Sequence, residues 1–219
     1  MKLPPWSYTS LRDAENCLRQ FHRVRVLKDI PFVETEASKW GNRVHDALEK
    51  RLRDGTPLPE DMAQYEPFIP AKTHRLRGLI EFKMGIREDA SFCGFFADEV
   101  WGRGKLDFGL IDHDQHQAII VDWKTGRPRE DPDELEIFAL MLKAKYPDLK
   151  VITGWYVWLK EKRMGKVHDL SDTNGKLASV KHRLQRIQQA ADMDTWPPNE
   201  GPLCGYCAVS DCEFNRVRR

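Results

Sequence analysis

Apolar residues recur every three or four positions along several stretches of the chain, which is the spacing of an amphipathic helix. The pattern predicts helices over residues 9–25, 38–53, 132–145 and 174–193. In the second of these, Val44, Leu48 and Leu52 share one face, and Gly55 follows as a stop signal. His45 lies on the same stripe.

Short segments rich in β-branched and aromatic residues occupy the middle of the chain and indicate strands. They predict strands over residues 78–86, 92–101, 105–111, 117–124, 151–160 and 166–170. Residues 54–73 contain several prolines and are predicted to form a loop. The resulting order of helices, strands, helix, strands and helix predicts an α/β fold with a mixed sheet flanked by helices.

The predicted hairpin of residues 105–124 is the most informative segment. Its polar turn is residues 112–116, and a hairpin symmetric about the centre of that turn places Asp107 directly opposite Asp122. Cross-strand partners project to one face, and Lys124 shares that face because it follows Asp122 by two residues. Two carboxylates and an ammonium group are therefore predicted to converge. Such a group suits Mg²⁺ or Mn²⁺.

A metal at this place would polarise a scissile phosphate and lower the pKa of a bound water. Lys124 would orient that water or neutralise the charge that develops on the phosphate. The alternative is that Asp107 and Asp122 are solvated charges and Lys124 is their salt-bridge partner. Asp122 ends the apolar run of residues 118–121, where an unpaired carboxylate is costly to bury. This context favours a metal site for phosphodiester hydrolysis.

Composition and charge limit the classes of protein to which this chain can belong. A chain of 219 residues with 41% hydrophobic content is long enough for one globular domain, residues 1–219. The net charge of +1 excludes a uniformly basic nucleic-acid coat protein, so any basic surface must be local. No apolar run approaches the roughly 20 residues of a membrane span, and the first residues lack a secretory signal. We therefore expect a cytoplasmic protein with no membrane partner.

Four of the five cysteines indicate a second metal site. Cys204, Cys207 and Cys212 cluster near the end of the chain, and Cys17 lies in the first predicted helix. Disulfides are rare in the cytosol, whereas four thiolates can bind either Zn²⁺ or an iron-sulfur cluster. Such a site would join the N- and C-terminal segments. Cys93 is left over and is predicted to be a small core residue.

Three motifs resemble those of the PD-(D/E)XK nuclease superfamily, in particular its RecB-like and CRISPR-adaptation-associated members. Gly104-Lys-Leu-Asp107 is similar to the family's G-x-x-D, residues 121–126 to its D-x-K-T-G, and Gly41-Asn-Arg-Val-His45 to its G-x-x-x-H. The resemblance runs from Ser7 to Cys212 and implies a restriction-endonuclease-like fold.

By this resemblance Asp107, Asp122 and His45 are ligands of Mg²⁺ or Mn²⁺, together with the backbone carbonyl of Trp123. Lys124 is the catalytic lysine. Two further residues have possible supporting roles: Glu81, where relatives often carry a carboxylate, and Glu134. Glu134 and Phe138 stand where the family usually has Gln and Tyr, which is a departure from its pattern.

The resemblance also implies an activity and a cluster. Cys17, Cys204, Cys207 and Cys212 match the ligands of a [4Fe-4S] cluster, although the last gap is one residue shorter than expected. Structural Zn²⁺ is the alternative. The G-x-x-x-H motif implies a DNA exonuclease acting on single-stranded or free ends, in recombination, repair or DNA processing. Its rivals are a structure-specific or processing endonuclease, and a non-catalytic metal-cluster DNA-binding module.

Overall fold

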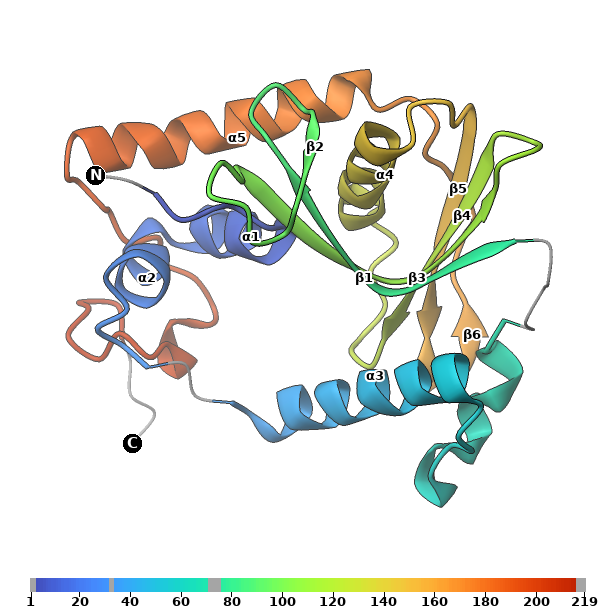
Figure 1. Cartoon of the computed structure of the whole chain (residues 1–219). Coiled ribbons are helices and arrows are strands. Elements are labelled where there is room, and N and C mark those ends of the chain that lie inside the picture. The colour runs from blue at the N-terminus through green and yellow to red at the C-terminus, as the bar shows by residue number, and fades with distance from the viewer. Residues whose placement is uncertain (1–2, 32–33, 71–75, 216–219) are drawn as a thin grey trace. The chain divides into compact units, whose positions relative to one another are not determined.

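The structure is a computed structural model that describes residues 3–31, 34–70 and 76–215 (Figure 1). It divides into two compact units. The sheet unit comprises residues 34–176, and the cysteine unit comprises residues 1–33 and 177–219. Within the described residues, no helix is long and apolar enough to cross a bilayer.

The sheet unit is built on seven strands in the order β2-β1-β3-β4-β5-β6, with β7 pairing with β5. The strands are β1 (Arg77–Ile86), β2 (Phe92–Cys93), β3 (Gly102–Asp112), β4 (Gln117–Lys124), β5 (Val151–Trp158), β6 (Arg163–Met164) and β7 (His168–Asp169). Its helices are α3 (Glu36–Asp54) and α4 (Asp133–Lys145), with 3-10 turns η2 (Glu60–Phe68) and η3 (Leu159–Glu161). This mixed α/β architecture agrees with the predicted fold class.

Most strand pairs are antiparallel, but β4 and β5 run parallel. The connection between them contains α4, as a parallel pair requires a crossover of a dozen or more residues. The predicted strand over 92–101 is shorter in the structure and ends at Cys93. Residues 94–100 instead form successive turns, closed by Ala97 N–H to Gly94 O and Val100 N–H to Ala97 O.

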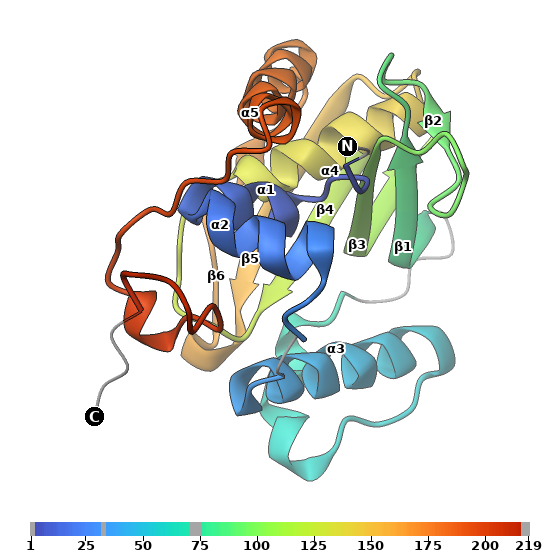
Figure 2. The same ribbon diagram turned by 90° about the vertical axis from the view of Figure 1, so that its left-hand side faces the viewer.

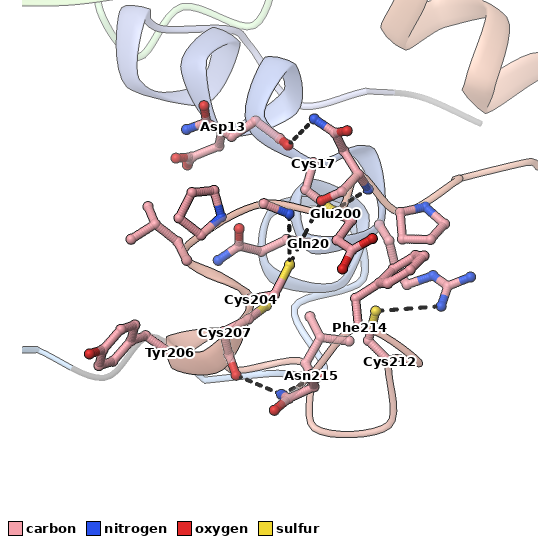
Figure 3. A pocket seen from close by; sticks show the side chains of 18 of the residues that line it. Asp13, Cys17, Gln20, Glu200, Cys204, Tyr206, Cys207, Cys212, Phe214 and Asn215 are labelled. Atoms are coloured by element: carbon pink, nitrogen blue, oxygen red, sulfur yellow. Dashed lines mark hydrogen bonds between the residues drawn. The ribbon is translucent and has the colours of Figure 1, made fainter. Parts of the chain in front are cut away.

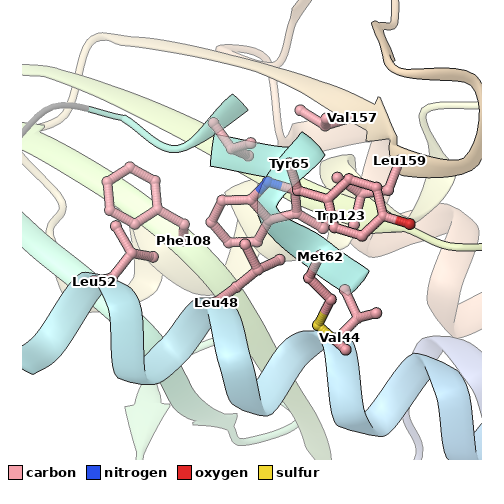
Figure 4. Close-up of a cluster of buried hydrophobic side chains, with 10 residues drawn as sticks. Val44, Leu48, Leu52, Met62, Tyr65, Phe108, Trp123, Val157 and Leu159 are labelled. Carbon is pink, nitrogen blue, oxygen red and sulfur yellow. The ribbon is translucent and has the colours of Figure 1, made fainter. Parts of the chain in front are cut away.

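Helix α3 covers one face of the sheet and α4 the other (Figure 1). The apolar stripe Val44, Leu48 and Leu52 packs on Phe108 of β3 and Trp123 of β4, as Figure 4 shows. Met62 and Tyr65 of η2 complete this cluster, so the predicted loop over 54–73 contains a helical turn that closes the core. Residues 71–73 of that predicted loop lie outside the described residues.

On the opposite face α4 approaches β3 very closely. A Cβ atom added to Gly104 would lie 2.7 Å from Met141 Sδ and 3.2 Å from Phe138 Cε1. Both α4 side chains are buried, so neither can move away without opening the core. Gly104 therefore sets the distance between α4 and the strand that carries Asp107.

The cysteine unit contains α1 (Tyr8–Asn16), α2 (Leu18–Phe21), the π-helical turn η1 (His22–Leu27), most of α5 (Asn174–Asp192) and the 3-10 turn η4 (Cys204–Tyr206). Figure 2 shows α1 and α2 in blue, facing the viewer. The predicted helix over 9–25 is not continuous, because Cys17 has extended backbone, φ −165° and ψ 114°. The His22 ring stacks on Trp196, with centroids 4.3 Å apart.

Candidate metal centre

The hairpin register agrees with the prediction. The paired residues of β3 and β4 run from Asp112 with Gln117 to Phe108 with Val121. Asp107 and Asp122 are the next positions in that register, but they are not paired themselves. Instead the Asp107 side chain contacts the backbone of β4: its Oδ2 accepts a hydrogen bond of 3.0 Å from the Trp123 amide.

The departure from regular pairing continues on the other side of β3. Ile80 pairs with Phe108 and Phe82 with Leu106, yet Glu81 and Asp107 between them do not pair. Glu81 has φ +48°, a left-handed conformation that is uncommon for a residue with a side chain. Such strain persists only where the surrounding structure imposes it, and it is frequent at functional sites.

His45, Glu81 and Asp107 form one group. Their ligand atoms all lie within 4.8 Å of one another, which makes the group able to hold a metal ion. His45 Nδ1 is 3.3 Å from Asp107 Oδ1 and 3.7 Å from Glu81 Oε1. The other Glu81 oxygen forms an ion pair with Lys105 of β3. Asp122 is predicted to be a ligand, but it lies outside this compact group.

The carboxylates control the charge of the histidine. Burial alone lowers the pKa of His45, but hydrogen bonds to Asp107 and then to Glu81 outweigh it and raise the pKa to about 10. The pKa of Glu81 is correspondingly lowered, since contacts with His45 and Lys105 overcome the effect of burial. The two carboxylates therefore favour the protonated form of the imidazole. A bound cation would replace that proton.

A second polar group adjoins the first. Trp123 packs in the apolar cluster under α3, so Asp122 and Lys124 turn to the opposite face by strand alternation. There Lys124 Nζ lies 2.7 Å from Asp122 Oδ2 and 2.7 Å from Glu134 Oε2 of α4. Lys124 Nζ also lies 5.6 Å from the centre of the Tyr156 ring.

Burial and charge compete strongly in this second group. Burial raises the pKa of Asp122, the Lys124 ammonium opposes this, and the carboxylates of Asp107 and Glu134 raise the pKa further. For Lys124, burial lowers the pKa, but Asp122 and Glu134 raise it above its ordinary value. Lys124 is therefore a fixed positive charge beside two acids.

Glu134 and Phe138, which stand where the family usually has Gln and Tyr, lie in different surroundings. Glu134 accepts a hydrogen bond from Lys124 Nζ, and its supporting role stays a prediction. Phe138 is 4% exposed and packs where a Gly104 side chain would be, so it is a core residue. Sequence reasoning missed Lys105 as the partner of Glu81; its position two residues before Asp107 was the available signal.

The cysteine unit contains a separate pocket of about 560 Å³. Cys17, Cys204, Cys207 and Cys212 all line it, together with Asn215, as Figure 3 shows. All five cysteines of the chain are free thiols, and Cys93 is buried elsewhere in the sheet unit. The break at Cys17 and the turn η4 bring thiols from distant parts of the sequence to this pocket.

The thiols receive several polar contacts. The amide of Asn199 lies 3.4 Å from Cys17 Sγ, and the amide of Gly201 lies 3.3 Å from Cys204 Sγ. Burial raises the pKa of the Cys207 thiol, and the other three thiols contribute in the same direction. No three of these sulfur atoms form a group within 4.8 Å in the described part of the chain.

Comparisons with known proteins agree with the fold and show the family. The sequence model of the PD-(D/E)XK nuclease superfamily matches residues 5–212. The chain belongs to that superfamily, whose members are nucleases that use Mg²⁺ or Mn²⁺ and act on nucleic acid.

A solved structure supports the same fold. The crystal structure of SSO0001 is similar, with a TM-score of 0.53 and 15% sequence identity, over 99% of this chain and 89% of that chain. At this identity the likeness concerns the fold alone. No curated protein matches the sequence significantly.

Proposed function

We propose that this protein is a divalent-metal-dependent deoxyribonuclease that hydrolyses phosphodiester bonds from single-stranded DNA ends, in recombination, repair or DNA processing. The observation that carries the proposal is the compact group of His45, Glu81 and Asp107, beside the ion pair of Asp122 with Lys124. Family membership supplies the nuclease chemistry. The choice of an exonuclease over an endonuclease rests on the resemblance of residues 41–45 to the G-x-x-x-H motif.

The residues fit a divalent cation. Asp107 is held by the Trp123 amide through Oδ2, while its Oδ1 faces His45. The strained Glu81 backbone keeps a second carboxylate beside it. We assign His45, Asp107, Asp122 and the Trp123 carbonyl as ligands, with Glu81 in support. When bound, the ion supplies Lewis-acid polarisation of the phosphodiester and lowers the pKa of a water.

Lys124 is assigned as the catalytic lysine. Its two carboxylate partners, Asp122 and Glu134, hold Nζ in one place. A fixed cation of this kind neutralises negative charge on the phosphate oxygens without reorganising during the reaction. Lys124 can also orient the attacking water through its N–H groups, which only donate hydrogen bonds. Glu134 is a positioning residue that acts through Lys124.

The pocket thiols are assigned to a [4Fe-4S] cluster held by Cys17, Cys204, Cys207 and Cys212. Structural Zn²⁺ is the alternative, since four thiolates can hold either group. The choice of the cluster rests on the resemblance of these four positions to the iron-sulfur nucleases of the superfamily. Amide contacts at Cys17 and Cys204 are of the kind that tune cluster sulfurs. The family match spans both units, and we propose that they form one nuclease domain.

The activity is tested with end-labelled single-stranded DNA, blunt duplex and closed single-stranded circles, each with Mg²⁺, Mn²⁺ or EDTA. We expect metal-dependent shortening of the linear single strand, while circles survive and EDTA abolishes cleavage. Cleavage of circles at the linear rate would instead assign a processing endonuclease. A protein that cleaves no DNA with either metal would overturn the proposed function.

The cluster is tested independently of activity. Protein purified without air should be brown, absorb broadly in the visible and contain about four iron and four sulfide ions per chain. A colourless protein with one zinc per chain would overturn the cluster assignment and leave the nuclease proposal standing.

A further inference from the structure

Phe96 is a large apolar side chain that the fold leaves in solvent. It lies in the connection between β2 and β3, which stands out beside β1 in Figure 2, and it is 73% exposed. Exposure forgoes most of the ~1.5–3 kcal/mol that burying a Phe side chain provides. The ring packs edge-on against Phe95, with centroids 4.9 Å apart and planes 73° apart.

Two cations accompany these rings. Lys83 Nζ lies 5.9 Å from the Phe95 centroid and 5.5 Å from that of Phe96. The Arg103 guanidinium carbon lies 5.4 Å and 5.8 Å from the same centroids. Neither Lys83 nor Arg103 forms an ion pair with any described residue, and Arg103 Nε is buried without a hydrogen-bond partner there.

A third cation extends this surface toward the metal centre. Lys83 of β1 and Lys105 of β3 are direct cross-strand partners, an arrangement that is unfavourable for like charges. Lys105 is partly neutralised by Glu81, whereas Lys83 has no acidic partner among the described residues. We call Lys83, Phe95, Phe96, Arg103 and Lys105 the Phe96 surface.

The Phe96 surface is continuous with the proposed site. A groove of about 650 Å³ is lined by Glu81, Lys83 and Lys105, together with Glu49, Arg53 and Arg77. Glu81 belongs to the group that can hold a metal, and Lys83 follows it by two residues, roughly 7 Å along a strand. A nucleic-acid strand with one phosphate at the metal centre can therefore extend over Lys105 and Lys83 to Phe96.

We propose that the Phe96 surface binds single-stranded DNA on its way to the metal centre, with phosphates on Lys83, Lys105 and Arg103 and a base stacked on Phe96. This inference rests on the proposed function and names its substrate-binding surface. Exposed rings between cations are how proteins hold single strands, because every unpaired base offers a flat face. A duplex keeps its bases stacked on one another, so it gains only the phosphate contacts.

Charge complementarity supports this occupant. The chain as a whole has a net charge of +1, so a surface with three cations and one partly engaged acid stands out against it. Two acids lie in the same connection: Glu99 is paired with Arg87, and Asp98 is exposed and has no ion pair among the described residues, so three cations of the surface face one acid of the connection that is not engaged elsewhere. A nucleic-acid strand can therefore contact the unpaired cations Lys83 and Arg103 and the exposed Phe96 ring at the same time.

The test measures equilibrium binding of the full-length protein to a fluorescent oligothymidylate of about 15 nucleotides in EDTA, so that no cleavage occurs. Phe96→Ala should raise Kd roughly five- to thirty-fold, the equivalent of ~1–2 kcal/mol for one stacked base. Lys83→Ala should reduce the slope of log affinity against log salt by ~0.7, the loss of one phosphate contact on a single strand.

Two exposed residues of the cysteine unit provide matched controls. Met193 is also 73% exposed, and Lys181 is an exposed lysine of α5. Met193→Ala and Lys181→Ala should leave Kd and its salt dependence unchanged. Phe96→Ala and Lys83→Ala proteins that bind oligothymidylate as tightly as the wild type would overturn the proposal. A loss confined to oligouridylate would assign the surface to RNA and overturn the DNA assignment.

Hydrolysis separates this inference from the proposed function. Phe96→Ala should raise KM for long single strands and leave blunt-duplex binding unchanged. Wild-type protein that cleaves DNA while both variants match it in binding and KM would refute the Phe96 surface alone. Wild-type protein without any cleavage would refute the nuclease function itself.

Discussion

The metal centre and the cysteine pocket hold their polar groups in different ways. At the metal centre Asp107 and Asp122 are 5% and 3% exposed and lie on strands that the α3 cluster and α4 fix from both faces. In the pocket, the four thiols are only half-buried, and short turns and single amide contacts position them. Packing preorganises the first site, whereas under the proposed cluster assignment the second would gain rigidity from its ligand.

We therefore expect substitutions at the metal centre and in the cysteine pocket to remove different properties of the protein. Damage to the metal centre should remove activity and spare folding, because the apolar cluster does not depend on the acids. Damage to the pocket should unfold the cysteine unit and spare the sheet unit.

The largest expected effect is at the catalytic lysine. Lys124→Ala should lower Mn²⁺-dependent cleavage by about 10²- to 10³-fold, since it removes a fixed cation from the phosphate, and Asp122→Ala should lower it at least as far. Initial rates on end-labelled single-stranded DNA measure the effect, with circular dichroism to confirm folding. Lys176 is the matched control, because it too bridges two carboxylates, Asp133 and Glu136, away from the metal centre. If either variant cleaves at the wild-type rate, the proposed mechanism is wrong.

The next effect concerns the thiols. Cys17→Ala should abolish visible absorbance and make residues 177–215 sensitive to protease, while the fragment around residues 34–176 resists digestion. Iron analysis and mass spectrometry of the limited digest measure this. Cys93→Ala should keep its iron, because Cys93 lies in the core of the sheet unit. Equal iron content in the two variants would contradict the assignment of Cys17.

A smaller effect tests the packing of α4 on β3. Gly104→Ala should lower the free energy of unfolding by about 1–3 kcal/mol, because its Cβ overlaps Met141 Sδ in a packed core. Urea denaturation measures the change. Gly78→Ala on β1 meets no atom within 4 Å and should change stability by under ~0.5 kcal/mol. Equal stabilities of the two variants would show that α4 can retreat from β3.

The smallest effect tests the departure from the family motif. Glu134→Gln keeps an acceptor oxygen for Lys124 but removes one of the two charges that hold it. We expect cleavage to change by less than about tenfold, because Asp122 still holds Lys124. A loss as large as that of Lys124→Ala would make Glu134 itself catalytic.

The sequence predicted the hairpin well because the information was local. The polar turn of residues 112–116 and the flanking apolar runs determine the register of β3 on β4, and the pairing from Phe108 with Val121 onward confirms it. Strand alternation likewise placed Lys124 beside Asp122. Helix α3 was predicted within two residues at its start and one at its end, because its apolar stripe is regular and Gly55 follows its last residue.

Other features depend on tertiary structure. No local signal marks Glu81 for a positive φ, since that conformation is imposed where β1 and β3 stop pairing. The break at Cys17 interrupts a sequence that is helical by its pattern. The parallel pairing of β4 with β5 arises from the crossover through α4, and the strand pattern alone does not reveal strand direction.

The pocket also has a consequence for biosynthesis. Cys17 leaves the ribosome long before Cys204, and the whole sheet unit, residues 34–176, is made in between. At ~5–20 residues per second this interval is roughly 10–40 s. The sheet unit can fold during that time while the N-terminal segment still lacks its partner residues 177–215. If the proposed cluster is held by these thiols, its insertion is a late step in maturation, because Cys17 waits for Cys204, Cys207 and Cys212.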